Sequence, residues 1–98
     1  MALLGHRWQV LRASITILFF LENRISGLSL PASVVKGYKN HLAETRSLLE
    51  GWKTEAASAN IRALMEKVRA DLAGGGIGQA DADVLTEPLE RLLELIEK

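Results

Sequence analysis

The chain has no cysteine among its 98 residues. Disulfide frameworks, thiolate catalysis and cysteine-based zinc sites are therefore excluded. Cytosolic and exported proteins can both lack cysteine, but nothing in the chain requires export, so we expect a cytoplasmic location. Proline, with 2 residues, and aromatic residues, at 5%, are also scarce, whereas the abundant Leu, Ala and Glu are strong helix formers.

Long apolar runs are absent as well. The longest, Ile15–Leu21, includes Thr16 and is bracketed by Arg12 and Glu22. A membrane-spanning helix needs about 20 apolar residues, so we expect no span. Arginines at Arg7 and Arg12 ahead of an apolar stretch are typical of a signal peptide, but no Ala-x-Ala cleavage site follows. A signal segment stays open as an alternative to a mature first helix.

Neither sign of charge predominates, because 12 basic residues balance 12 acidic ones. The distribution is nevertheless uneven. Residues 1–30 hold three arginines and one glutamate, residues 31–53 hold four basic and two acidic residues, and residues 74–98 hold six acidic and two basic ones. The basic part and the acidic end suit each other, within one chain or between two. The basic residues are too sparse for the dense face that nucleic-acid binding requires, so we expect no nucleic-acid partner.

Apolar residues recur at spacings of three and four, the period of an α-helix. The pattern predicts helices at about residues 3–25, 31–52, 58–73 and 87–97. The second helix carries a heptad seam of Val35, Tyr38, Leu42, Thr45, Leu49 and Trp52. Because no stretch alternates as a strand would, we predict an all-α fold. We expect a single domain over residues 1–98, a small antiparallel helical bundle of about four helices, with the first helix at its centre.

The glycine cluster Gly74–Gly78 ends the third predicted helix. It resembles a phosphate-binding loop only superficially, because it follows a helix and lacks a Gly-Lys-Ser/Thr ending. Thr86 is a good N-cap, and Pro88 then falls in the first turn of the last helix. We therefore interpret residues 74–86 as a flexible joint.

The first helix has an unusually wide apolar surface. At 100° per residue its apolar side chains fill an arc of roughly 200°, against roughly 100° for an ordinary surface helix. Phe20 stands apart, among the polar residues on the opposite side. Three short companion helices can cover part of this arc, and we expect a second copy or another protein to cover the rest. The alternative is a monomeric bundle with this helix buried in its middle.

Aromatic and large apolar residues dominate protein interfaces, so they are the predicted contact residues. Glu22 joins them because it lies in the same helical row as Leu18 and Ile25, where a partner's cation would pair with it or water would reach it. The predicted interface residues are Trp8, Leu11, Ile15, Phe19, Phe20, Glu22, Tyr38 and Trp52.

Catalytic and metal-binding constellations are missing from the pattern. The neutral-pH acid–base candidates are His6 and His41, and His41 shares a helix face only with Glu44. Carboxylate-bridged metal sites in bundles need several inward-facing acids in a Glu-x-x-His order, so we interpret this pair as exposed and solvated. Neither a nucleophile elbow nor a catalytic triad is present. We therefore predict no enzymatic activity, no cofactor, no metal site and no small-molecule substrate.

These features together predict a non-enzymatic protein–protein interaction module, such as an adaptor, an assembly subunit or a small inhibitor. The expected partner is a second copy in a homodimer, the commonest closed assembly, or another protein. One alternative is a membrane-surface protein anchored by the amphipathic first helix through Trp8, Phe19 and Phe20. Another is a binder of a small apolar ligand held within the bundle.

Overall fold

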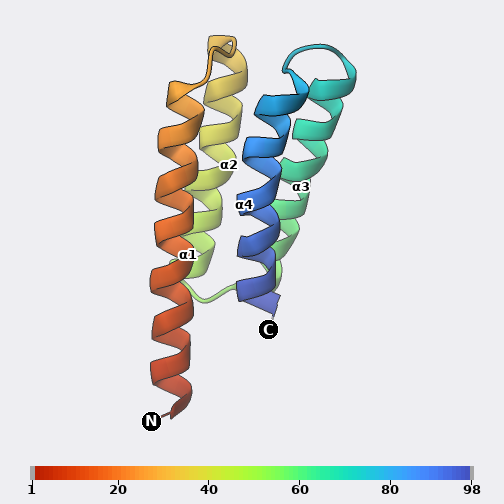
Figure 1. Cartoon of the computed structure of the whole chain (residues 1–98). Helices are drawn as coiled ribbons and strands as arrows, with labels where there is room; N and C mark the ends of the chain where they lie inside the picture. Colours follow the sequence, from red (N-terminus) through yellow and green to blue (C-terminus); the bar gives the residue numbers. More distant parts are fainter. Residues whose placement is uncertain (1, 98) are drawn as a thin grey trace.

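The computed structural model describes the backbone of residues 2–97 and the side chains of residues 8–97. Over residues 2–97 the chain forms four α-helices and no strand: α1 (Ala2–Gly27), α2 (Ala32–Glu50), α3 (Thr54–Ala73) and α4 (Gln79–Glu97) (Figure 1). Successive helices run antiparallel and are joined by short connections. The predicted all-α helical bundle is confirmed.

The four helices form a closed ring. α1 packs against α2 and α4, and α3 packs against the same two helices. Across the described residues no close backbone approach joins α1 to α3 or α2 to α4. The expectation that the first helix lies at the centre is therefore wrong. Short loops bring each helix beside its neighbours in sequence, so α1 occupies one corner of the ring with part of its surface turned outward.

The core runs the length of the bundle and draws on all four helices. Its members are the buried apolar side chains, most of them at most 2% exposed: Leu18, Leu21, Ile25, Tyr38, Leu42, Leu49, Ala57, Ile61, Leu64, Val68, Ile77, Ala82, Leu85, Leu89 and Leu92. Four members of the predicted α2 seam, Tyr38, Leu42, Thr45 and Leu49, are fully buried. The helical period read from the sequence therefore identified the inward face of α2.

The connection from α2 to α3 is tighter than expected. α3 begins at Thr54, four residues before the predicted start, and Trp52 takes up a left-handed backbone conformation with φ of 55° in the turn. Early initiation brings Ala57 and Ser58 into the helix, where both are buried. Tertiary burial therefore extends α3 beyond its apolar stripe in the sequence.

The start of α4 differs more strongly from the prediction, which placed it at about residue 87. The helix begins at Gln79, and Pro88 lies in its interior rather than in its first turn. Thr86 is not an N-cap, because its hydroxyl donates to the carbonyl of Ala82 at 2.7 Å inside the helix. An interior proline costs about 3 kcal/mol. The extension buries Leu85, which contributes about 1.5–3 kcal/mol, and Ala82, on the same face as the later leucines. This burial offsets the cost of the interior proline.

The predicted flexible joint is a short turn. Gly75 adopts a φ of 81°, which L-residues disfavour, and the Gly76 amide donates to the carbonyl of Asp71 at 2.8 Å. Ile77 inserts into the core with only 5% of its surface exposed. A buried isoleucine between the glycines anchors the turn, so α4 packs closely on its own bundle.

α1 is longer than its neighbours, with 26 residues against 19 in α2 and 19 in α4. Because the chain turns back directly after Gly27, the surplus projects at the N-terminal end of α1, beyond the ends of the other helices (Figure 1). At 1.5 Å per residue this projection is about 10 Å long. The side chains of Leu3, Leu4, His6 and Arg7 in this segment lie outside the described residues.

Two buried hydroxyls have different surroundings. Thr45 donates to the carbonyl of His41 at 2.9 Å and accepts from the amide of Asn60 at 2.8 Å. The Ser14 hydroxyl in α1 is also fully buried, yet within the described part of the chain it has no hydrogen-bond partner. A buried polar group without a partner costs about 1–3 kcal/mol. Ser14 is therefore a local source of instability in α1.

Replacing Ser14 by alanine should raise the free energy of unfolding by about 1 kcal/mol, because the substitution removes an unpaired hydroxyl and improves helix propensity. The matched variant Thr45→Ala should lower it by about 1–2 kcal/mol, since it removes the hydroxyl that accepts from Asn60 and donates to the carbonyl of His41. Urea denaturation of both variants measures the difference. A Ser14→Ala protein less stable than the wild type would show that the Ser14 hydroxyl is bonded in solution.

Candidate interaction surface

Three large hydrophobic side chains stand out from the fold, and all three belong to α1. Trp8 is 60% exposed, Phe19 is 62% exposed and Phe20 is 50% exposed. Within residues 8–97 no other large hydrophobic side chain reaches this class of exposure. They remain exposed because α1 packs on two helices only, so the half of its circumference that faces away from the core has no cover.

The exposed aromatic residues lie on two different sides of α1. Eleven residues separate Trp8 from Phe19, which places them within about 20° of each other around the helix axis. Leu11 and Ile15 lie between them on the same side of the helix and are half-buried. Phe20 is rotated by about 100° from Phe19, toward α4. We call the first side the aromatic row, formed by Trp8, Leu11, Ile15 and Phe19.

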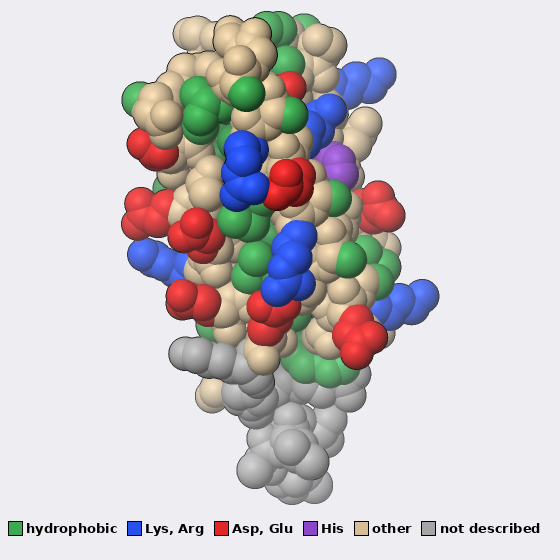
Figure 2. Space-filling model, turned by 90° about the vertical axis from the view of Figure 1, so that its right-hand side faces the viewer, with side chains coloured by type: hydrophobic (Ala, Val, Ile, Leu, Met, Phe, Trp, Pro, Cys, Tyr) green, Lys and Arg blue, Asp and Glu red, His purple; other side chains and the backbone are tan. Residues whose placement is uncertain are grey.

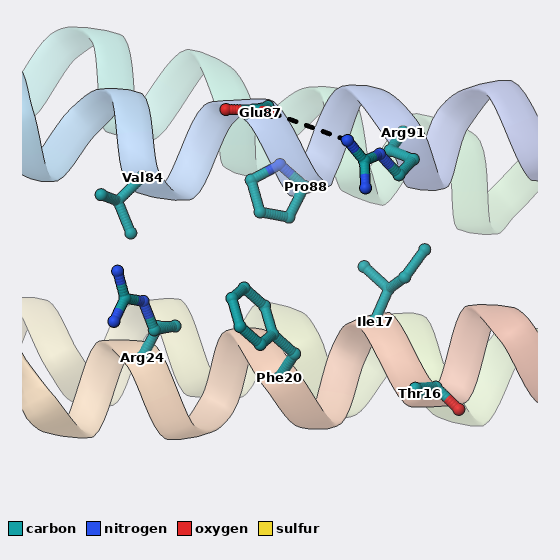
Figure 3. Close-up of a pocket in the computed structure, with 8 residues that line it drawn as sticks. All are labelled: Thr16, Ile17, Phe20, Arg24, Val84, Glu87, Pro88 and Arg91. Carbon is teal, nitrogen blue, oxygen red and sulfur yellow. Dashed lines mark ion pairs between the residues drawn. The ribbon is translucent and has the colours of Figure 1, made fainter.

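Phe20 lies in a groove between α1 and α4 (Figure 3). The groove has a volume of about 430 Å³ and is lined by Thr16, Ile17, Phe20, Arg24, Val84, Glu87, Pro88 and Arg91. Ile17, Phe20 and Arg24 project from α1 toward α4. Val84 and Pro88 face them from the other wall. We call this surface the α1–α4 groove.

Charged side chains border the apolar part of the α1–α4 groove. The guanidinium of Arg24 lies over the ring of Phe20, 5.8 Å from its centroid, a cation–π arrangement. On the other wall Arg91 and Glu87 form an exposed ion pair at 3.6 Å, one helical turn apart. Arg24 makes no ion pair with any of residues 8–97. The groove therefore combines an apolar floor with an arginine whose charge is not neutralised by a described carboxylate.

The remaining predicted interface residues lie elsewhere. Glu22 is half-buried at the edge of the aromatic row. Trp52 is half-buried in the turn between α2 and α3. Tyr38 is fully buried in the core and cannot contact a partner without unfolding of the bundle. The heptad spacing correctly placed Tyr38 on the apolar face of α2, but that face packs in the core, so Tyr38 is not part of an exposed interaction surface.

Tyr38 joins α2 to α3 through its hydroxyl, which donates to a carboxylate oxygen of Asp71 at 2.5 Å. Burial of the ring, then the hydrogen bond to Asp71 and the charge of that carboxylate, raise the pKa of Tyr38 well above its ordinary value. The folded state therefore favours the neutral phenol. Stability from this group is complete below the unfolded-state pKa of about 10 and is lost as pH rises from there toward the folded-state pKa.

The free energy of unfolding should therefore fall above pH ~10, by up to about 1.4 kcal/mol per pH unit from Tyr38 alone. Tyr38→Phe should lack this contribution, while lysine deprotonation continues in both proteins. Urea unfolding at a series of alkaline pH values tests the difference. Because Tyr38 is the only tyrosine, tyrosinate absorbance reports directly on it and should appear together with unfolding. Ionisation of Tyr38 at its ordinary pKa in a fully folded protein would contradict the assignment.

His41 is not the solvated side chain that its spacing indicated. It is half-buried between α2 and α3, and its Nδ1 lies 2.9 Å from Oδ1 of Asn60. The Asn60 amide nitrogen donates to the carbonyl of His41 and to Thr45, so its oxygen faces the imidazole. Nδ1 must then carry the proton. The expected companion Glu44 is exposed and does not join this network.

Neither a metal site nor an internal ligand cavity is visible in the described residues. Within residues 8–97 no group of three or more His, Asp or Glu side chains is placed to hold a metal ion. The void among the core side chains, bordered by Tyr38 and Leu42, is too small for a water molecule. Among the described residues no helix is long and apolar enough to cross a membrane.

The side of the bundle formed by α3 looks very different from α1. Acidic and basic side chains alternate there, and hydrophobic side chains form only small separate patches (Figure 2). Two exposed ion pairs lie on α3, Arg62 with Glu97 of α4 at 2.5 Å and Arg69 with Glu66 at 2.5 Å. This is the composition of an ordinary solvated surface. The apolar excess is therefore confined to the α1 side.

Comparison of the chain with protein-family models, curated proteins and solved structures found no match. Any functional assignment therefore rests on the chemistry of the surfaces described above.

Proposed function

We propose that the protein is a non-enzymatic interaction module that buries the outer surface of α1 against another protein chain, in the first place a second copy of itself. One observation carries the proposal: Trp8, Phe19 and Phe20 are half or more exposed on a single helix. Scattered single hydrophobic residues are normal on a surface, whereas larger exposed apolar surface, here three large aromatic side chains on one helix, marks an interaction site. Tryptophan and other aromatic side chains are also the commonest energetic centres of interfaces.

The length of α1 supports the same conclusion. Its projecting N-terminal turns extend the helix surface beyond the neighbouring helices, next to Trp8. Isolated helical turns in water are marginal, because most helix stability in proteins comes from packing of an apolar face. A partner lying along α1 would cover the projection and the exposed aromatic side chains together.

Self-association is the simplest form of this proposal. The formal net charge is zero, so two copies approach without overall repulsion. Each aromatic side chain offers about 150–250 Å² when fully buried, and stable interfaces bury about 1,200–2,000 Å² in total. Three half-exposed aromatic side chains from each of two copies contribute a substantial part of that area, and the surrounding groove and row residues contribute more.

The expected result is a mass that approaches twice 10.8 kDa at high concentration and falls toward 10.8 kDa on dilution. Replacing all three exposed aromatic residues of α1 by alanine should weaken this association at least about tenfold, because each exposed anchor that is truncated typically costs more than about 1 kcal/mol of binding. Sedimentation velocity over a dilution series measures both proteins. The matched control Arg69→Ala, on the solvated α3 side, should associate like the wild type.

Thermal unfolding of the same variants separates binding from folding. Since the three rings are largely exposed in the single chain, the triple variant should keep nearly the wild-type stability at a dilution where both proteins are monomeric. A wild-type protein that stays monomeric at every concentration would remove self-association from the proposal. Flotation with anionic vesicles at low salt, without self-association, would instead favour the membrane-surface alternative.

A further inference from the structure

We propose that the α1–α4 groove binds a small amphipathic carboxylate, whose alkyl chain lies on the apolar floor and whose carboxylate pairs with Arg24. The inference goes beyond the proposed function, because one copy of the chain holds the whole site. It follows from three features of this groove. The floor is apolar and of ligand size, the other polar lining groups have partners on their own helices, and Arg24 lies at one end without a described polar partner.

The floor of the α1–α4 groove is formed by apolar side chains from both helices. Ile17 and Phe20 of α1 face Val84 and Pro88 of α4 across it (Figure 3). Phe20 is half exposed and the other three side chains are half-buried, so all four keep some contact with water. The volume of about 430 Å³ falls within the range of roughly 300–1,000 Å³ for small-molecule sites. Because removal of apolar surface from water is favourable, this floor suits an alkyl chain.

Three of the four polar residues that line the groove have partners on their own helix. The hydroxyl of Thr16 donates to the carbonyl of Arg12 at 2.9 Å. The carboxylate of Glu87 pairs with Arg91 at 3.6 Å, and this ion pair runs along α4 (Figure 3). The fourth, Arg24, forms no hydrogen bond or ion pair with any described side chain or carbonyl. Its charge and its N–H donors are therefore available to a ligand.

Arg24 is positioned at one end of the apolar floor. Its side chain projects from α1 toward Val84, and its guanidinium lies over the ring of Phe20, 5.8 Å from the centroid. The N–H donors of a guanidinium form a fork that matches both oxygens of a carboxylate, and the ring offers them no oxygen acceptor. The contact with the ring also restricts the side chain before a ligand arrives, which lowers the entropy lost on binding.

The charge of the lining favours a ligand with one negative charge. Arg24 and Arg91 carry two positive charges and Glu87 carries one negative charge, which leaves a net charge of +1. A carboxylate balances this charge, whereas a phosphate monoester exceeds it with about −1.5 to −2 at neutral pH. A neutral alcohol of the same length covers the floor but gives Arg24 no anionic partner. The groove should therefore prefer the alkyl carboxylate to the alcohol.

The dimensions of the groove indicate the length of the alkyl chain. The α1 wall runs from Thr16 to Arg24, which is about 12 Å at 1.5 Å per residue. With the carboxylate at Arg24, the chain runs over Phe20 toward Ile17. A medium-length chain such as that of octanoate covers most of this distance, so octanoate is a suitable probe and 1-octanol is its neutral control.

Titration of the protein with each probe, followed by two-dimensional amide NMR, tests for the site. Octanoate below its micelle concentration should cause saturable shifts at the amides of residues 16–24 and 84–91, the two walls of the groove. It should bind at least about fivefold more tightly than 1-octanol, because its carboxylate forms charge-assisted hydrogen bonds with Arg24.

Variants of the arginine and of the floor test the two parts of the site separately. Arg24→Gln should weaken octanoate binding at least about fivefold and remove the preference over 1-octanol. The matched control Arg12→Gln changes an exposed arginine of α1 outside the groove and should bind like the wild type. Phe20→Ala should weaken the binding of both probes, because it removes part of the floor. All three side chains are exposed, so the variants should fold, which circular dichroism checks.

Octanoate shifts that do not saturate, or binding that is unchanged in Arg24→Gln, would overturn the proposed site. Equal binding of octanoate and 1-octanol would overturn it as well. Sedimentation velocity measures self-association separately, so the two proposals can fail independently. A wild-type protein that is monomeric at every concentration, yet binds octanoate through Arg24, supports the site and removes self-association. Absence of octanoate binding overturns the site and leaves the interaction function of α1 in place.

Discussion

A four-helix ring gives each helix only two neighbours, and this constraint underlies the rest of the molecule. Each helix can hide about half of its circumference, which suits α2, α3 and α4 because their apolar stripes are narrow. α1 carries a wider apolar arc in the same position. Its inner residues Leu18, Leu21 and Ile25 are completely buried. The rest of its apolar arc faces outward, so Trp8 and Phe19 are exposed and Phe20 is half exposed.

The polar contacts between helices are distributed just as unevenly. Tyr38 with Asp71, and His41 with Asn60, hold α2 to α3 in one register. An exposed ion pair joins α3 to α4. Among residues 8–97 no side-chain hydrogen bond or ion pair joins α1 to another helix, and its one buried hydroxyl, that of Ser14, is unpaired. In the described part of the chain α1 is thus held to the other helices by apolar packing.

The separation of charge complements this picture. α4 is strongly acidic, α1 is basic, and the ring places them side by side with an apolar groove between them. Few of these charges are neutralised inside the single chain, because neighbouring helices point their charged faces outward rather than at each other. Some of the acidic side chains of α4 face α3 instead of this groove: Asp83 borders Arg69, and Glu97 pairs with Arg62.

Helix number, helix type and the inward face of α2 followed from the sequence alone, because a 3.6-residue apolar period is a local property. The wide apolar arc of α1 was equally visible there. Other features depended on which helices become neighbours, and no local pattern carries that information. Burial of Ala82 and Leu85 extends α4 through Pro88, Asn60 gives His41 a partner from another helix, and the corner position of α1 separates Phe20 in the groove from Trp8 and Phe19 on the outer row. Tyr38 was a predicted interface residue, but tertiary packing buries it in the core. A heptad pattern shows that a position is apolar, but it does not show whether the core of the same chain or a partner covers that position.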